Sequence, residues 1–194
     1  NDWKRAILLD STNFKWHLGL GDLYFAKADL DHAEVEFTKA RNLALDSTEA
    51  RFKLAELRLL KGDHKNAMAE VNDALRIDDQ NARGYFLKGW IHREAGDTTL
   101  AISSYRTATE RDPQLYEAFM ALARLHADMN DPLAWQYYNS LVDLRPQSVE
   151  ALYARGLYAQ EHGRDSIALS DYDLIKTLDP NNPTPWYNTG YIYL

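Results

Sequence analysis

Six histidines are the side chains of this 194-residue sequence that most invite a metal-binding interpretation. His92 and His126 stand in equivalent places of two neighbouring helical stretches. Stacked helical units place equivalent residues roughly 10 Å apart, which is too far for two imidazoles to share one ion. The sequence also has no HExxH motif and no third ligand at a suitable spacing. We therefore expect packed or partly exposed imidazoles and no metal site.

Nucleophiles and phosphate-binding loops are equally hard to find. The sequence has no GxSxG motif, no glycine-rich phosphate loop and no cysteine, so disulfides and cysteine-ligated metals are excluded as well. The carboxylates of "DLDHAE" and "IDDQN" fall where Asp and Asn cap helices and form turns. We expect a protein that is not an enzyme and that needs no cofactor.

Composition narrows the possible partners. Asp and Glu outnumber Lys and Arg by 29 to 22, which argues against a nucleic-acid partner because such a protein needs a basic face. No apolar run approaches the roughly 18 residues that a membrane span requires, so we expect a soluble chain. The compartment stays undecided between the cytoplasm and a bacterial envelope or periplasm, since the lack of cysteine fits both.

A regular period runs through the whole sequence. Each unit holds two helical patterns separated by a break such as "KGDH" or "AGDT". An alanine follows the small residue of the first pattern by 12 positions in most units, and a large apolar residue comes four positions later, as in Ala101 and Tyr105. The sequence therefore predicts a helix–turn–helix repeated in tandem. The small residues recur at gaps of 34, 34, 34, 33 and 34: Gly21, Ala55, Gly89, Ala123, Gly156 and Gly190.

Gly89 shows why a small residue recurs. A glycine in the middle of a helix costs about 1 kcal/mol relative to alanine. We expect packing to offset this cost, because the missing side chain lets the second helix approach closely with Ala101 facing Gly89. The one short gap lies before Ala134, at Asp131-Pro132, where we expect the deletion to shorten a turn and to leave both helices in register.

These residues resemble the tetratricopeptide repeat family, whose pattern over about 34 residues is an aromatic, Leu-Gly, Tyr, Ala, Phe, Ala and Pro. The resemblance implies an all-α fold, a right-handed superhelical α-solenoid of stacked antiparallel helix pairs. The clearest block, 82–115, carries the pattern as Tyr85, Gly89, Ala101, Tyr105, Ala108 and Pro113. We expect five tandem repeats, at 14–47, 48–81, 82–115, 116–148 and 149–182.

Both ends of the sequence fall inside the repeat pattern. Residues 1–13 match the second helix of a preceding repeat, with Trp3 and Ala6 in register, and residues 183–194 match the first helix of a truncated sixth repeat. Arrays of this kind need polar capping repeats for solubility, and neither end carries one. We therefore expect a segment of a longer protein.

The resemblance also implies that the first helices of the repeats line a concave groove, the usual partner site of the family. In the third repeat, Tyr85, Gly89 and His92 form the packing face, so the neighbouring stripe should look into the groove. Aromatic residues and arginine dominate binding hot spots. The expected groove residues are Phe52, Lys53, Glu56, Phe86, Trp90, Arg93, Met120, Arg124, Tyr153, Leu157, Tyr187, Asn188 and Tyr191.

Packing against the adjacent repeat and exposure in the groove explain Phe86 and Tyr153 equally well. For Trp90, flanked by Arg93 and Arg124, we favour the groove. The expected ligand is an extended peptide or an amphipathic helix with apolar anchors and some acidic character to meet the two arginines. The function that we expect first is thus a non-enzymatic scaffold for protein–protein interaction.

Two specific uses of the family do not fit the residues. A clamp for the terminal carboxylate of chaperone tails needs Lys, Asn and Arg on three successive first helices, and no three adjacent repeats supply them. The asparagine ladder of a sugar-transferase array is also missing, because its places hold Gly19, Lys53, Leu87, Ala121, Ala154 and Asn188.

Two alternative functions remain open. One is a structural spacer that self-associates end to end through Trp186, Tyr191 and Trp3. The other is a regulatory segment of a larger enzyme, or of a secretion or envelope assembly protein.

Overall fold

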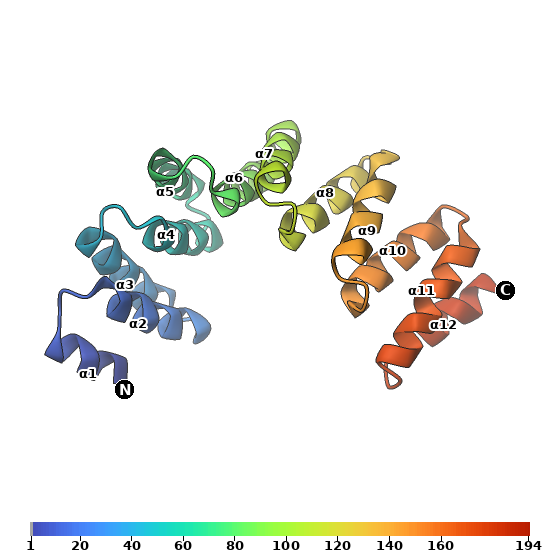
Figure 1. Cartoon of the computed structure of the whole chain (residues 1–194), viewed down its shortest axis with the longest axis horizontal. Coiled ribbons are helices and arrows are strands. Elements are labelled where there is room, and N and C mark those ends of the chain that lie inside the picture. The colour runs from blue at the N-terminus through green and yellow to red at the C-terminus, as the bar shows by residue number, and fades with distance from the viewer. Residues whose placement is uncertain (1) are drawn as a thin grey trace. The chain divides into compact units, whose positions relative to one another are not determined.

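The computed structural model describes residues 2–194; residue 1, with which the predicted segment 1–13 begins, lies outside the described residues. Over the described part the chain forms twelve α-helices and no strand (Figure 1). None of these helices is both long enough and apolar enough to cross a membrane. The helices are α1 (Asp2–Leu9), α2 (Phe14–Ala26), α3 (Leu30–Leu43), α4 (Thr48–Leu60), α5 (His64–Ile77), α6 (Ala82–Glu94), α7 (Thr98–Arg111), α8 (Tyr116–Asp128), α9 (Leu133–Leu144), α10 (Val149–Glu161), α11 (Asp165–Leu178) and α12 (Thr184–Ile192).

The chain divides into two compact units, Asn1–Arg111 and Asp112–Leu194. The first unit holds α1 to α7 and two apolar clusters, one around Phe37 and Leu54 and the other around Phe52 and Leu87. The second unit holds α8 to α12 around one apolar cluster that includes Tyr172. In both units the even-numbered helices from α2 to α10 are the first helices of pairs, and each packs on the odd-numbered helix that follows it.

Short polar caps explain where many of these helices begin. Ser47 Oγ accepts a hydrogen bond from the Ala50 amide, and Ser148 Oγ accepts one from Ala151. Asp63 caps α5 in the same way, through the Asn66 amide. These side chains satisfy amide groups that a helix start leaves without intrahelical partners.

Five equivalent turns reverse the chain inside the pairs, and each has three residues. The middle residue of each turn has a positive φ, between 53° and 83°. Glycine adopts this conformation without strain, whereas a side chain costs about 1–2 kcal/mol there. The middle residues are Ala28, Gly62, Gly96, Asn130 and Gly163.

The one-residue deletion lies in a helix and not in a turn, so that part of the expectation was wrong. The turn after α8 keeps its three residues, 129–131, while α9 has 12 residues where α3, α5, α7 and α11 have 14. Asp131 Oδ1 still accepts a hydrogen bond from the Leu133 amide, 2.9 Å away. The first turn of α9 therefore absorbs the missing residue.

Gly89 makes room for an aromatic ring and not for Ala101. A β-carbon on Gly89 would lie 2.6 Å from Cδ1 of Tyr105, a buried residue on α7. Gly21 meets Phe37 and Gly156 meets Tyr172 in the same way, always with the same separation along the chain. The recurring small residue is thus one half of a ring-on-glycine contact that joins the two helices of a pair.

Candidate functional site

The first-helix face of the first unit carries an aromatic pair on α6. The rings of Phe86 and Trp90 lie 6.5 Å apart, and Phe86 also lies 5.6 Å from the buried ring of Tyr105. Both side chains are half-buried. Trp90 Nε1 donates a hydrogen bond to Glu94, whose carboxylate lies 3.3 Å away. Phe86 is therefore anchored to the core, while the indole of Trp90 ends in a polar contact at the surface.

Arg93 already has an acidic partner within its own helix. Its Nη2 lies 2.7 Å from Glu94 Oε1, and both side chains are exposed. The hydrogen bond from Arg93 lowers the pKa of Glu94, so this carboxyl is ionised at neutral pH. An acidic residue of a ligand would have to compete with Glu94 for this guanidinium.

Ion pairs connect successive first helices of the first unit. Lys53 on α4 lies 2.7 Å from Asp22 on α2, and Arg83 on α6 lies 2.6 Å from Glu56 on α4. The guanidinium of Arg83 also lies over the ring of Phe52, 5.9 Å from its centroid. Lys53 and Glu56, two of the predicted groove residues, are therefore engaged between repeats.

Three predicted groove residues are buried. Phe52, Met120 and Asn188 are 2%, 6% and 7% exposed. Phe52 packs against Gly84, since a β-carbon there would lie 3.2 Å from its Cζ. Asn188 donates a hydrogen bond to the hydroxyl of Tyr172. These side chains hold neighbouring helices together and offer almost no surface to a partner.

The remaining predicted residues lie on first helices of the second unit. Arg124 on α8 lies 3.7 Å from Glu150 on α10, and both are exposed. Tyr153 lines a hollow of 350 Å³ with Glu150 and Asn182, and Leu157 is half-buried on the same helix. Tyr187 and Tyr191 are exposed on α12 and line a separate hollow of 410 Å³.

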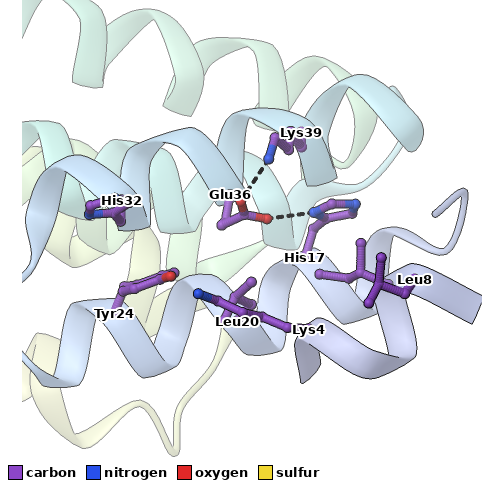
Figure 2. Close-up of a pocket in the computed structure, with 9 residues that line it drawn as sticks. Lys4, Leu8, His17, Leu20, Tyr24, His32, Glu36 and Lys39 are labelled. Atoms are coloured by element: carbon purple, nitrogen blue, oxygen red, sulfur yellow. Dashed lines mark hydrogen bonds and ion pairs between the residues drawn. The ribbon is translucent and has the colours of Figure 1, made fainter. Parts of the chain in front are cut away.

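Sequence reasoning missed a polar hollow of 440 Å³ between α1, α2 and α3 (Figure 2). The buried carboxylate of Glu36 lies 2.6 Å from His17 Nδ1 and 2.7 Å from Lys39 Nζ. Burial alone would raise the pKa of Glu36, but the hydrogen bonds from Lys39 and His17 outweigh it and hold the pKa below its ordinary value. The hollow is therefore built around an ionised acid.

The rim of this hollow is aromatic and cationic. The rings of Tyr24 and His32 stack 5.0 Å apart, and Lys4 Nζ lies 5.8 Å from the centroid of Tyr24. His32 Nδ1 lies 2.9 Å from the carboxylate of Asp29. Acid and base groups thus meet here in ion pairs, an arrangement that stabilises helix packing and can accept a small polar group at its edge.

A second buried acid, Glu70 on α5, was also missed. Its carboxylate lies 2.5 Å from Arg41, 2.9 Å from Arg58 and 3.2 Å from Arg51. Glu36 and Glu70 stand one repeat period apart, each directly before the large apolar residue of a second helix. An acid at such a place in a repeat was the signal that could have revealed both.

The histidines do not gather into a metal site. Among residues 2–194, no group of three His, Asp or Glu side chains could hold a metal ion. His126 is buried, and its Nδ1 lies 2.9 Å from Asp131 in the following turn. His92 lies 3.9 Å from Asp97, the residue at the same place in its own repeat. Both histidines therefore contact the turn that ends their helix pair's first helix.

The chain belongs to the tetratricopeptide repeat family. One family model for this repeat matches residues 18–82 and a second matches residues 82–115, so that together they cover just over half of the sequence. Repeats of this family generally mediate protein–protein interactions, and the fold is typically non-catalytic. The residues described here form these helical repeats without a separate catalytic domain.

Comparison with individual proteins gives the same family. The sequence is 27% identical to the mouse (Mus musculus) Superkiller complex protein 3 over 183 residues, which is 90% of this chain and 12% of that protein. This chain therefore spans about an eighth of the length of that relative. Among solved structures, PilF of Pseudomonas aeruginosa matches with a TM-score of 0.77 at 19% identity, over 94% of this chain and 87% of that one. YrrB, described as a TPR protein with an unusual peptide-binding site, matches with a TM-score of 0.62 at 17% identity, over 98% of both chains.

Proposed function

We propose that the first-helix face of each unit binds a protein segment, as an extended peptide or an amphipathic helix, in the groove that these helices line. The family membership supports a protein partner in general. The peptide-binding site of YrrB is a property of that protein, and it makes the same mode of binding a reasonable proposal for this chain.

The observation that carries the proposal is the state of Trp90. A half-buried indole next to the half-buried ring of Phe86 leaves apolar aromatic surface in contact with water. Covering such surface gains roughly 25 cal/mol per Å², and tryptophan is among the residues that most often dominate binding. Glu94 holds the indole through its N–H, so little side-chain freedom is left to lose on binding.

The ion pairs refine the expected ligand. In the first unit Arg93, Lys53 and Arg83 all have acidic partners, so a ligand there needs apolar anchors more than acidic ones. In the second unit Arg124 and Glu150 form an exposed pair at 3.7 Å, which is worth little in water and which a ligand carboxylate can displace. An acidic residue of the ligand is therefore expected opposite Arg124, together with an apolar residue near Tyr153.

Peptide selection tests the proposal without a known partner. Phage-displayed libraries of helical and extended peptides are selected on the immobilised chain, and the recovered peptides are measured by calorimetry against the unchanged chain and Trp90→Ala. We expect at least tenfold weaker binding by Trp90→Ala, about 1.4 kcal/mol, with an unchanged helical circular dichroism spectrum.

Leu100→Ala is the matched control, because Leu100 is exposed on the second helix α7 and its truncation leaves the first-helix face intact. Equal affinities for all three chains, together with a loss of several kcal/mol of stability in Trp90→Ala, would mean that Trp90 is a core residue and that the binding face is misplaced.

A further inference from the structure

The aromatic residue of a second helix lies between two first helices. Tyr172 on α11 shows both contacts. A β-carbon on Gly156 of α10 would lie 2.9 Å from its ring, and its hydroxyl accepts a hydrogen bond from Asn188 on α12, 3.3 Å away. Tyr172 is fully buried as a result. Each such ring therefore needs a glycine or other small residue behind it and a first helix in front of it.

Gly190 on α12 has the place of Gly156 in the period but not its ring. Among the described residues, no atom lies within 4 Å of the position of a β-carbon on Gly190. The side chains around it are exposed aromatics, and they line the hollow of 410 Å³. Helix α12 carries no charged residue, so covering this face desolvates no charge of α12. The hollow is lined by Trp186, Tyr187, Gly190, Tyr191 and Leu194.

Trp3 on α1 has the opposite deficit. It stands one repeat period before Phe37, the ring of the first complete repeat, and Ala6 stands in the same relation to Ala40. Trp3 packs on the helix that follows it, since a β-carbon on Gly19 would lie 2.7 Å from its indole. It is nevertheless 37% exposed, where Phe37 is 1% exposed. The first helix that would lie behind this ring is the element that the contact lacks.

We propose that α12 of one molecule docks against α1 of a second copy of this chain, with Trp3 of the second copy on Gly190. The two helices then complete one repeat across the boundary between the molecules. The joint is the same ring-on-glycine contact that each unit contains internally, and it covers the exposed aromatic surface of α12. This contact is heterologous, because one molecule contributes α12 and the other α1, so association continues beyond the dimer.

Cysteine cross-linking tests the register directly, since the natural chain has no cysteine. In the internal joint, a β-carbon on Gly156 would lie 3.3 Å from Cβ of Asp171, the residue before Tyr172. Asp2 stands in the same place before Trp3. Disulfides span Cβ distances of about 3.5–4.5 Å, so Gly190→Cys on one molecule is expected to oxidise with Asp2→Cys on another.

A mixture of the two single-cysteine chains should form a mixed disulfide several-fold faster than either chain forms its own. Leu174→Cys, an exposed position on α11, replaces Asp2→Cys in the control mixture. Faster pairing of Gly190→Cys with itself would show that the α12 face meets its own copy and would overturn the proposal. A mixed rate no higher than that of the control mixture would overturn it as well.

Association is measured by light scattering between about 10 µM and about 1 mM, a range that brackets weak contacts of small area. We expect the average mass to rise above that of a dimer. Gly190→Leu, which fills the open space without touching the core, should lower the association constant at least tenfold. Trp90→Ala should associate like the unchanged chain, which separates this proposal from the groove. A chain that stays monomeric over the whole range would overturn the second-copy contact and assign the face to a helix of another protein.

Discussion

In the repeats 14–47 and 48–81, a glutamate stands directly before the large apolar residue of the second helix, Glu36 in one and Glu70 in the other. Both are buried, but their surroundings differ. Three guanidinium groups surround Glu70, whereas Glu36 meets one imidazole and one ammonium beside an open hollow. The same backbone position therefore supports a closed charge cluster in one repeat and a solvent-filled edge in the other.

The difference follows from single residues at equivalent places. Arg51 and Arg58 of the second repeat correspond to His17 and Tyr24, one period earlier. Arg41, the third partner of Glu70, corresponds to Ile7 on α1. Arginine donates in a fixed fork and reaches a buried carboxylate from several helices, which histidine, tyrosine and isoleucine cannot do. Burying an acid in this family position is thus tolerated in two ways, by dense pairing or by partial access to the surface.

The largest effect is expected from Glu70→Gln. Removing the charge leaves three arginines around a neutral amide, and breaking a buried ion pair in this way costs about 3 kcal/mol or more. Urea denaturation followed by circular dichroism measures the loss. Arg51 and Arg58 have second acidic partners, Asp73 and Glu34, which keep the loss near the lower limit. A loss below that of Glu36→Gln would contradict the comparison.

Glu36→Gln should cost less, about 1–2 kcal/mol at neutral pH, because only two donors lose a charged acceptor. The effect should depend on pH. A carboxyl whose pKa is lowered by folding adds stability above its unfolded pKa, and this stability disappears as the pH falls through the folded pKa. The difference between the natural chain and Glu36→Gln should therefore shrink below about pH 4.5. A difference that grows in acid would show that the carboxyl is not held ionised by Lys39 and His17.

The turns of the same two repeats provide an exchange of about 1 kcal/mol. Ala28 and Gly62 occupy the same place with φ values of 58° and 76°. Ala28→Gly should stabilise the chain by up to about 1 kcal/mol, and Gly62→Ala should destabilise it by a similar amount. Thermal denaturation of both variants measures the two shifts. Shifts of the same sign would contradict the equivalence of the turns.

The smallest effect is expected from Lys39→Met. Lys39 forms an ion pair with Glu36, but half of its side chain is exposed, so water screens the pair and the loss should stay below about 1 kcal/mol. Urea denaturation at low and high salt measures it, and the natural chain should lose the same small amount in salt. A loss as large as that of Glu70→Gln would mean that the hollow is as closed as the arginine cluster.

Much of the backbone could be predicted from the sequence, because small residues such as Gly89 and breaks such as "AGDT" recur at one period. The pairing partner could not. Gly89 was expected to face Ala101, but Tyr105 fills the space, since a ring one helical turn further along α7 reaches across the pair. The period states which helix comes next, while the contact depends on how far each side chain extends.

The face of the first helices was harder to predict for the same reason. Phe52 and Phe86 occupy equivalent places one period apart, yet Phe52 is buried and Phe86 is half-buried. Phe52 lies under Arg83 and against Gly84 of the next first helix. Neighbours from another repeat decide the exposure of each ring, and a pattern within one repeat does not contain them.

The ring-on-glycine contact has a consequence for how such a chain can change its length. Because Phe37, Tyr105 and Tyr172 each meet a glycine at one fixed separation before them in the sequence, these helix pairs are closed by the same internal fit. Adding or excising a whole period leaves each pair with its own ring and its own cradle. A gene of this kind can therefore grow or shrink by duplication in units of one repeat, while a change of a few residues inside a pair would separate the ring from its seat.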